Sequence, residues 1–330
     1  MKMLIVGGAG YIGIHVSLAF LDRGDSVSVL DNFSSGSRAN LPEGVAVLEG
    51  DIMDRSFLNR ALSLGWDGVV HLAALKAAGE SMMNPGKYAL NNISGTINLI
   101  NAIIEHGSPP LVFSSSAAVF GEPLRLPIDE EHPKSPVNFY GFTKLEIENT
   151  LDWYDRLTAL RFASLRYFNA AGYDLDGRVV EPEQKPQNLL PRIMETAAGL
   201  RESLTIYGDD YDTPDGTCIR DYIHVSDLAD AHVQAMDHLV AHKKGLKVNL
   251  GSESGISVGQ MVSGAKEITG VDFPHVVGPR RPGDPAKIVA SSALAQQLLG
   301  WKASRSDNET LLESTWKLYR DRYLDGMHSR

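Results

Sequence analysis

The chain has 330 residues, of which 43% are hydrophobic and 22% charged, a composition typical of globular proteins rather than of disordered or fibrous ones. With 31 Lys and Arg against 41 Asp and Glu, the net charge is −10, which argues against a nucleic acid or an anionic membrane as the main partner. A single cysteine, Cys218, excludes an internal disulfide, and no hydrophobic run near the N-terminus is long enough for a signal segment or a membrane span. We therefore expect a soluble cytoplasmic protein with one large domain or two closely joined ones.

The first half of the sequence alternates short aliphatic runs with longer amphipathic ones. Strands are predicted at 2–6, 26–30, 45–48, 69–72 and 111–115, with helices at 12–23, 56–64 and 88–105 between them. A helix over 138–154 and a strand over 163–168 follow. This alternation predicts βαβ units, and hence an α/β fold with a Rossmann-type, doubly wound parallel sheet that has helices on both faces.

The second half is less regular. Polar stretches rich in Gly, Asp and Pro occupy 172–186, 208–217 and 278–285, and long loops of this kind in a compact protein usually bind ligands. A helix is predicted at 224–239, and a strand at 247–250 that returns to the first sheet. We therefore expect a first domain of residues 1–170, with returning segments near 224–250, and a smaller α/β C-terminal domain within 171–330, mainly 171–223 and 251–330.

A glycine-rich turn follows the first predicted strand. Gly8, Gly10 and Gly13 satisfy the pattern G-x-G-x-x-G, and Gly7, Gly10 and Gly13 have the glycine spacing of short-chain dehydrogenase relatives. Because the turn leaves a strand and opens a helix, its backbone amides can approach a pyrophosphate at the positive end of that helix. The sequence therefore predicts a dinucleotide cofactor, and the alternative is a tight turn without a ligand.

Two aspartates indicate which nucleotide binds. Asp31 ends the second strand, about 20 residues after the glycines, where a carboxylate accepts hydrogen bonds from the adenosine ribose. Its charge favours NAD over NADP, because a 2′-phosphate would meet a negative group, although Arg38 lies near in sequence. Asp51 follows the third strand and is expected either near the adenine or as the N-cap of the next helix.

A phenol and an ammonium lie four residues apart on the helix predicted at 138–154. Tyr140 and Lys144 therefore share one helix face. A tyrosine that abstracts a proton near pH 7 needs its pKa lowered by about 3 units from about 10, which a neighbouring ammonium and a positively charged nicotinamide favour. Ser116 closes a run of three serines at the carboxyl end of a strand, where parallel sheets bind ligands. We predict Ser116, Tyr140 and Lys144 as catalytic residues; the alternatives are a solvated helix face and a serine that starts a loop.

These motifs resemble the extended short-chain dehydrogenase/reductase superfamily, and within it the UDP-glucose 4-epimerases. The resemblance covers essentially the whole chain and rests on GGAGYIG at 7–13, HLAALKAAGES at 71–81, FSSSAAVFGE at 113–122, YGFTK at 140–144, LRYFNAAG at 165–172, QNLLPRI at 187–193 and YGDDYDTPDGTCIRDYIHVSDLADAH at 207–232. It implies NAD as the cofactor, UDP-glucose and UDP-galactose as substrates, and a homodimer built on the helices predicted at 88–105 and 138–154.

The resemblance also implies which residues bind each ligand. Those expected around NAD are Gly7, Gly10, Tyr11, Ile12, Gly13, Asp31, Asn32, Asp51, Ile52, Leu72, Ala73, Ala74, Lys76, Asn91, Tyr140, Lys144 and Phe168. Those expected around the UDP-sugar are Lys76, Ser116, Tyr140, Asn169, Asn188, Leu189, Tyr207, Arg220, Arg281, Asp284 and Ile288. Two residues depart from the family pattern: Ala118 and Phe120 stand where a hydroxyl residue and a tyrosine are usual.

Two arginines support an anionic substrate without reference to the resemblance. A diphosphate bound to a chain of net charge −10 needs local cations, and Arg220 and Arg281 lie in or beside the polar loops of the second half. Alternatively, either arginine forms a surface ion pair, for example with Asp221 or Asp284.

The expected activity is interconversion of UDP-glucose and UDP-galactose through a 4-keto sugar, with Tyr140 as the base and NAD as the hydride carrier. Alternatives are a 4-epimerase of a UDP-N-acetylhexosamine, UDP-uronate or UDP-pentose, a nucleotide-sugar dehydratase or decarboxylase, and a non-catalytic NAD sensor. Dehydratases that resemble this chain carry an Asp-Glu pair where it has Ala117 and Ala118. The resemblance places Ile288 beside the sugar, and its size predicts weak or absent turnover of N-acetylated substrates; the alternative is that Ile288 simply packs in a strand over 287–290.

Several residues look functional without a matching pattern. His224, His232, His238 and His242 have helical spacings, but no acidic partner completes a metal site, so core or solvated histidines and no metal are expected. Cys218 has neither a resolving cysteine nor an adjacent base, which indicates a packed thiol rather than a nucleophile.

Overall fold

Seven parallel strands form the main sheet of the computed structural model, which describes residues 1–184, 186–281 and 284–324. They are β1 (Lys2–Val6), β2 (Ser26–Asp31), β3 (Ala46–Glu49), β4 (Gly68–His71), β5 (Leu111–Ser116), β6 (Phe162–Tyr167) and β10 (Leu246–Leu250). Their order is β10-β6-β5-β4-β1-β2-β3, so the direction of winding reverses between β1 and β4. The predicted Rossmann-type sheet is confirmed, and β10 returns beside β6 as the sequence indicates.

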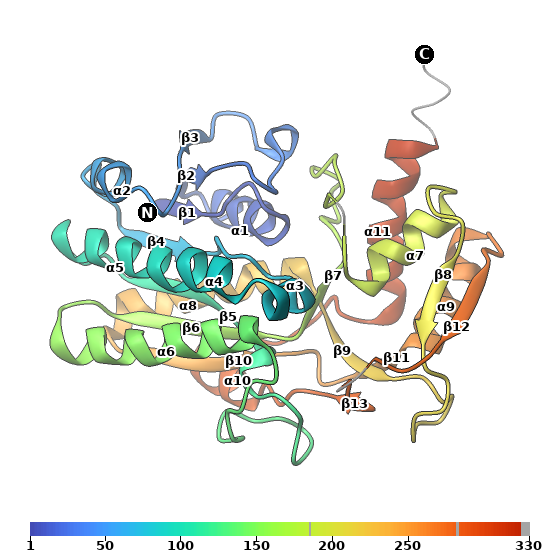
Figure 1. Cartoon of the computed structure of the whole chain (residues 1–330). Helices are drawn as coiled ribbons and strands as arrows, with labels where there is room; N and C mark the ends of the chain where they lie inside the picture. Colours follow the sequence, from blue (N-terminus) through green and yellow to red (C-terminus); the bar gives the residue numbers. More distant parts are fainter. Residues whose placement is uncertain (185, 282–283, 325–330) are drawn as a thin grey trace.

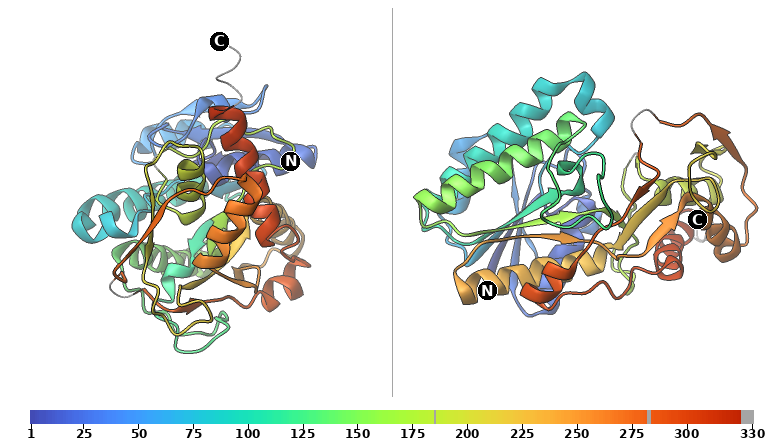
Figure 2. Two further views of the ribbon diagram at one scale, coloured as in Figure 1. Left: turned by 90° about the vertical axis from the view of Figure 1, so that its right-hand side faces the viewer. Right: turned by 90° about the horizontal axis from the view of Figure 1, so that it is seen from below.

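Alternating side chains of the strands explain the helix layers (Figure 1). From β1, Met3 and Ile5 pack in a core with α1 (Tyr11–Asp22) and α8 (Val225–His242), whereas Leu4 and Val6 pack in a second core on the opposite face. That second face carries α2 (Arg55–Leu62), α5 (Gly95–Glu105) and α6 (Phe139–Leu157). The right panel of Figure 2 shows the sheet between α8 and the layer of α5 and α6.

One predicted helix is wrong in detail. The stretch predicted as one helix over 88–105 consists of α4 (Pro85–Tyr88), a π-helical segment η2 (Ala89–Ser94) and α5. The buried amide of Asn92 lies in η2. Its Oδ1 accepts from the Leu75 backbone N–H at 2.9 Å, and its Nδ2 donates to the Leu75 carbonyl at 2.9 Å and to Thr143 Oγ1 at 3.2 Å. A single π turn of this kind often occurs where a helix must place a side chain at a site.

The second half builds a smaller set of layers, at the right of Figure 1. Strands β7 (Asn169–Ala171), β9 (Ile219–His224), β11 (Gly255–Ser257) and β13 (Lys287–Ile288) form one sheet, and β8 (Leu204–Tyr207) pairs with β12 (His275–Gly278). Its helices include α7 (Leu189–Ala197), α9 (Val258–Thr269) and α11 (Asn308–Tyr323), while α10 (Ala293–Leu299) packs on α8 and β10. The remaining short elements are α3 (Ala78–Met83), η1 (Arg38–Asn40) and η3 (Ala117–Val119). The three polar stretches predicted as loops are the connections between β7 and α7, between β8 and β9, and between β12 and β13, apart from residues 185, 282 and 283, which lie outside the described residues.

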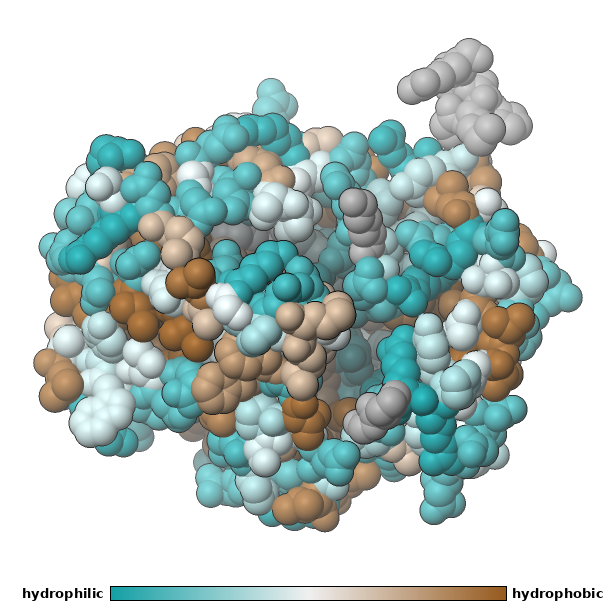
Figure 3. All heavy atoms as spheres, in the orientation of Figure 1, coloured by the Kyte–Doolittle hydropathy of each residue, from teal (hydrophilic) through white to brown (hydrophobic). Residues whose placement is uncertain are grey.

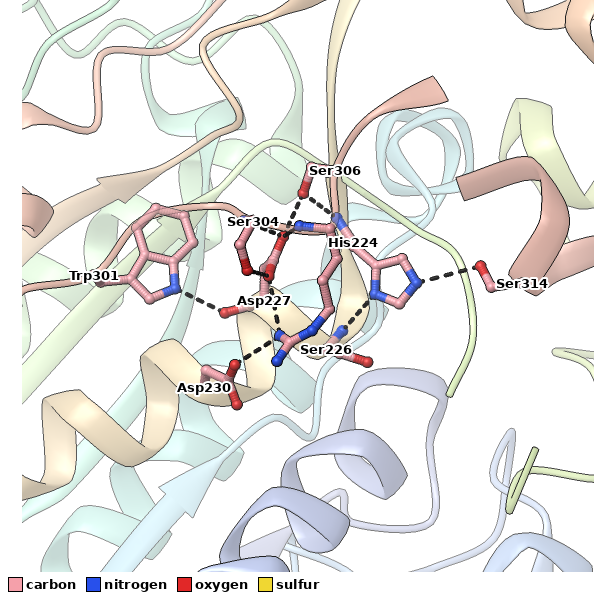
Figure 4. Close-up of polar contacts among 9 residues, drawn as sticks. His224, Ser226, Asp227, Asp230, Trp301, Ser304, Ser306 and Ser314 are labelled. Atoms are coloured by element: carbon pink, nitrogen blue, oxygen red, sulfur yellow. Dashed lines mark hydrogen bonds and ion pairs between the residues drawn. The ribbon is translucent and has the colours of Figure 1, made fainter. Parts of the chain in front are cut away.

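A buried carboxylate fastens the C-terminal segment to the start of α8 (Figure 4). Asp227 is 1% exposed and accepts from the backbone N–H groups of Ser304 and Arg305 at 3.1 and 2.9 Å, and from Ser306 Oγ at 2.7 Å. Ser306 Oγ in turn accepts from the backbone N–H of His224 at 2.8 Å. These bonds hold residues 304–306, in the segment between α10 and α11, against the start of α8 and the end of β9.

The histidines and the cysteine have structural surroundings. His224 and His232 are 0% exposed, and burial lowers the pKa of each to about 4, so both are neutral core side chains. Cys218 is buried, and its burial raises the thiol pKa. The described residues contain no group of three or more His, Cys, Asp or Glu that could hold a metal ion. No helix among the described residues is both long enough and apolar enough to cross a membrane.

Candidate functional site

The glycine turn after β1 is shaped by close backbone contacts. Gly7 has φ +82°, and a Cβ there would lie 2.5 Å from the backbone nitrogen of Ala73. A Cβ at Gly13 would lie 2.2 Å from the carbonyl oxygen of Gly7, so α1 can start here only without that side chain. At Gly10 the nearest atom to such a Cβ is the Gly7 carbonyl oxygen at 3.3 Å, and this position faces a cavity. Packing therefore requires Gly7 and Gly13, whereas Gly10 keeps space open for a ligand.

The first turn of α1 offers its backbone N–H groups to that cavity. Its N-cap is Gly10, and no side chain caps the helix. Tyr11, Ile12 and Gly13 line the same cavity. Uncapped N–H groups and the positive end of the helix dipole form a site for an anionic group such as a pyrophosphate.

The cavity beside this turn has a volume of about 430 Å³. Of the residues expected around the cofactor, it is lined by Gly7, Gly10, Tyr11, Ile12, Gly13, Leu72, Ala73, Ala74, Lys76, Tyr140 and Lys144. Lys76 forms an ion pair with Glu183, which lies in the loop between β7 and α7 and also lines the cavity. The loop therefore covers the cavity from the second half of the chain.

The aspartates lie at the carboxyl ends of β2 and β3, outside the cavity lining. Asp31 accepts from the backbone N–H of Ala9 at 3.0 Å and from that of Phe33 at 2.8 Å. The bond to Ala9 holds the glycine turn against the end of β2. Asp51 accepts from Asn32 Nδ2 at 2.8 Å and from the backbone N–H of Met53 at 2.8 Å. The N-cap of α2 is Asp54, so the alternative role considered for Asp51 is wrong.

Other predicted residues also lie away from the cavity lining. Ile52 is buried in the core under α2 and α5, Asn91 donates to Asn92 Oδ1 at 3.0 Å, and Phe168 packs on a small apolar cluster of Val119, Phe120 and Ile128. Their roles in cofactor binding stay predictions.

Tyr140 and Lys144 lie one turn apart on α6 and meet the end of β5. Helix α6 starts at Asn138, whose side chain accepts from the backbone N–H of Gly141 at 2.8 Å. The Lys144 ammonium donates to the carbonyl of Ser114 at 2.7 Å and lies 5.9 Å from the centre of the Tyr140 ring. Ser116 lies near enough to Tyr140 to lower the pKa of its phenol. The structure thus brings all three predicted catalytic residues together.

Burial acts on both ionisable groups of this trio. It raises the pKa of Tyr140, which the hydrogen bond with Ser116 lowers in part. Burial lowers the pKa of Lys144 to about 7, against the charge of Glu148, which raises it. Perturbed groups of this kind in a cavity are typical of an acid–base site.

A second cavity of about 270 Å³ lies between β7, α7, β8 and β9. Of the residues expected around the substrate, it is lined by Asn169, Asn188, Leu189, Tyr207, Arg220, Arg281 and Asp284. Gln187 and Asn188 line both cavities, so the two meet at the start of α7. Figure 3 shows the surface hollowed between the two parts of the molecule.

The arginines of the second cavity are held by their neighbours. Arg220 is 11% exposed and forms an ion pair with Asp284, and it donates to the carbonyl of Ile219 at 2.8 Å. Arg281 has its guanidinium 4.0 Å from the centre of the Tyr207 ring. The ion pair considered as an alternative for Arg220 therefore exists, but inside the cavity rather than on the surface. Asp221 does not pair with it and instead accepts from the backbone N–H of Ala290 at 3.0 Å.

Sequence reasoning missed several lining residues. Arg192 adds a third arginine to the second cavity and donates to Gln187 Oε1 at 2.8 Å. Both lie in QNLLPRI, a segment singled out for its resemblance, so the signal was present. Glu80, Tyr88 and Glu183 line the first cavity. Glu80 lies in HLAALKAAGES, another segment of the resemblance, whereas nothing in the local pattern of Tyr88 and Glu183 indicates this.

Comparisons with known proteins agree with this geometry. The model of the "NAD dependent epimerase/dehydratase family" matches residues 3–251, more than half of the chain. A UDP-glucose 4-epimerase from Corynebacterium glutamicum is 43% identical over 317 residues, 96% of this chain and 95% of that protein. A solved UDP-glucose 4-epimerase from Brucella ovis in complex with NAD has a TM-score of 0.94 and 41% identity, covering 96% of this chain and 98% of that chain.

A third relative was solved with both a cofactor and a nucleotide. It is a UDP-glucose 4-epimerase from Bifidobacterium longum in complex with NAD⁺ and UDP, with a TM-score of 0.91 and 35% identity, covering 99% of this chain and 100% of that chain. Matches of this length and identity confirm the resemblance drawn from the motifs, and the chain belongs to the NAD dependent epimerase/dehydratase family.

Proposed function

We propose that this chain is a UDP-glucose 4-epimerase that interconverts UDP-glucose and UDP-galactose with bound NAD. The observation that carries the proposal is the meeting of two cavities at Gln187 and Asn188. One cavity contains the glycine turn and the pair Tyr140 and Lys144. The other contains the arginines that a diphosphate requires. In this division the residues up to about 170, with 224–250, hold the cofactor, and the remainder holds the UDP-sugar.

The residues of the chain account for the proton transfers. Tyr140, as the phenolate, takes the proton from the sugar O4. It returns the proton after the sugar has rotated to present its opposite face. Lys144, one turn away, and Ser116 stabilise the phenolate by charge and by hydrogen bonding. Held at the glycine turn beside Tyr140 and Lys144, NAD would supply the hydride acceptor for C4 and the donor for the opposite face of the 4-keto sugar. Because one base and one nicotinamide face would serve both epimers, the sugar must turn while the diphosphate stays fixed.

The surroundings of the glycine turn favour NAD over NADP. Asp31 is 9% exposed and supports the turn at the end of β2, where its charge opposes a 2′-phosphate. Arg38, the nearest cation in sequence, forms an ion pair with Glu49 and stacks 3.8 Å from the centre of the Phe33 ring. Its charge is therefore already balanced.

The segment after Ser116 argues against a dehydratase. Ala117 and Ala118 form η3 there and carry no acidic side chain. Elimination of a sugar hydroxyl needs an acid and a base at the reacting carbons. The second activity named by the family is therefore disfavoured in this chain.

The whole proposal is tested by one preparation of the purified protein. We expect denaturation to release NAD rather than NADP, and the native protein to interconvert UDP-glucose and UDP-galactose without added reductant. Chromatography of the released cofactor and of the sugar nucleotides gives both answers. Recovery of mainly NADP, or a requirement for external reductant, would contradict the proposal.

Substitution of Tyr140 tests the base. Tyr140→Phe keeps the ring and removes the phenol, so we expect the fold and NAD to be retained and turnover to fall by about 100- to 10,000-fold. In Lys144→Ala the phenol loses its nearest cation, its pKa rises, and the pH–rate profile moves to higher pH. Near-normal turnover of Tyr140→Phe would show that another group is the base.

Substitution of Ile288 tests the size of the sugar pocket. Ile288 is paired with Arg220 across β13 and β9 and packs on the cluster of Val119, Phe120 and Ile128. Its β-branched side chain is stiff at χ1 and cannot swing aside easily. We expect the native protein to prefer UDP-glucose, and Ile288→Ser to raise the relative turnover of UDP-N-acetylglucosamine, with Ile288→Val as the control. Equal turnover of both substrates by the native protein would refute this role.

We also propose that the protein is a cytoplasmic homodimer. Apolar side chains lie exposed on neighbouring helices: Met82 (60%), Met83 (75%), Leu90 (59%), Phe142 (40%), Trp153 (60%) and Leu157 (75%). Brown side chains over α4–α6 are visible in Figure 3. Exposed apolar clusters of this kind are typical of protein interfaces. Sedimentation should give a dimer that Trp153→Glu weakens, whereas a monomeric native protein would contradict the proposal.

A further inference from the structure

A buried ion pair lies beneath the catalytic face of α6 and has no role in the mechanism above. Arg166 and Glu148 have side-chain exposures of 2% and 1%. Arg166 Nε donates to Glu148 Oε1 at 2.9 Å and Arg166 Nη2 donates to Glu148 Oε2 at 2.6 Å, so the ion pair is bidentate. Ser115 Oγ and Ser164 Oγ also donate to Oε1, at 2.6 and 3.0 Å. The carboxylate is thus held by donors from both β5 and β6.

The pair belongs to a register between α6 and β5. Tyr140, Lys144 and Glu148 follow one another at intervals of four residues, so they lie in one row along the helix. Two hydrogen bonds join this row to β5: the Lys144 ammonium donates to the Ser114 carbonyl, and Glu148 accepts from the Ser115 hydroxyl. A shift of the helix along the strand would break both bonds together.

Glu148 is also the charged group that acts on Lys144. The titratable groups near this row are His71 on β4, Glu80 on α3, Tyr88 on α4, Arg166 and Tyr167 on β6, Lys134, Glu130, and Lys247 on β10. Burial lowers the pKa of His71 to about 3, so it is neutral at working pH, and the tyrosine pKa values are raised. Burial lowers the pKa of Lys144 and the Glu148 carboxylate raises it.

Glu148 itself stays ionised. Its burial opposes ionisation, but the hydrogen bonds and charge of Arg166 and the hydroxyl of Ser115 outweigh it, so that the Glu148 pKa is lowered. A carboxylate, rather than a carboxylic acid, therefore lies one turn from Lys144.

Stability alone does not explain a charge at this position. Ile147 and Leu151, its neighbours on α6, are apolar and buried in the core beneath the sheet. Apolar residues in place of a buried ion pair are often neutral or stabilising, because desolvation of the two charges is costly. An apolar side chain would hold α6 on the sheet but would leave Lys144 without a negative neighbour.

We propose that Glu148 is a positioning residue for the proton transfer: clamped by Arg166 and Ser115, it fixes α6 in register with β5 and keeps the Lys144 ammonium charged beside Tyr140. This inference rests on the proposed function. It assigns to Glu148 no contact with substrate or cofactor, and it predicts that loss of its charge acts on Tyr140 through Lys144.

The test replaces Glu148 by Gln in the NAD-bound protein. Without the carboxylate Lys144 loses its proton at lower pH, the phenol loses its ammonium neighbour, and the phenolate forms at higher pH. We expect the pH–rate profile to move to higher pH by about one unit, the order of effect of a full charge one helix turn away. The ultraviolet absorbance of tyrosinate, taken as the difference from Tyr140→Phe, should move in the same direction, and it reports ionisation without turnover.

A double substitution separates the charge from packing. Because Glu148 acts through Lys144, Lys144→Ala combined with Glu148→Gln should show no shift beyond that of Lys144→Ala alone. A packing role would instead lower turnover by the same factor at every pH and leave both titrations in place. That result would overturn the inference while the epimerase activity of the native protein would still support the proposed function.

Two further variants serve as controls. One shows whether an unpaired buried arginine causes the effect of Glu148→Gln, and the other shows whether removing a different charge from α6 has the same effect. Glu148→Leu with Arg166→Met removes the pair without leaving an unpaired buried arginine. Its profile should move in the same direction as in Glu148→Gln but by less, because the positive charge of Arg166 is removed as well; an unmoved profile would again overturn the inference. Asp152→Asn is the matched control, since Asp152 lies four residues further along α6, is 35% exposed and pairs with Lys247 at 2.5 Å. Its profile should stay that of the native protein, and a shift equal to that of Glu148→Gln would contradict a specific role for Glu148.

Discussion

All seven strands of the main sheet run in one direction, and the site depends on this constraint. Parallel strands end at a common edge, where their connections diverge to opposite faces and leave a crevice. The glycine turn after β1, the segment after β4, the serines of β5 and the chain leaving β6 toward Asn169 all lie at that edge. Residues far apart in sequence thereby line two adjoining cavities.

Charge balance shapes both cavities. A chain of net charge −10 presents arginine and lysine at the places where phosphates are expected, and pairs them with carboxylates such as Glu183 and Asp284. Glu183 comes from the loop between β7 and α7, so the same ion pair joins the two halves of the molecule. Each ion pair also holds a flexible lysine or arginine side chain in one orientation. Less side-chain entropy is therefore lost when an anion binds.

Local pattern was sufficient for those features that depend on neighbours in sequence. The glycine spacing, the four-residue interval of Tyr140 and Lys144, and the strand alternation follow from helix and strand geometry, and the structure bears out the fold they predicted. The π segment between α4 and α5 depends on a contact between Asn92 and Leu75, which no helical period encodes. The contact of Glu148 with Ser115 depends in the same way on how α6 packs against β5. The cap of α2 is instead local, because Asp54 accepts from the backbone N–H of Phe57.

The departure at Phe120 shows how the packing beneath the site is maintained. Phe120 is 1% exposed, so a hydroxyl at its ring would need a buried partner. Its ring lies edge-on to His132 with centres 5.7 Å apart, and the guanidinium of Arg166 lies 5.3 Å from its centre. Arg166 therefore contacts an aromatic ring as well as the Glu148 carboxylate, and both contacts attract its positive charge. With Ala118 donating its backbone N–H to Ser116 Oγ at 3.2 Å, Ser116 keeps its orientation toward Tyr140 without a second hydroxyl in the segment. Phe120 thus packs against the arginine that holds Glu148 in the row of contacts between β5 and α6.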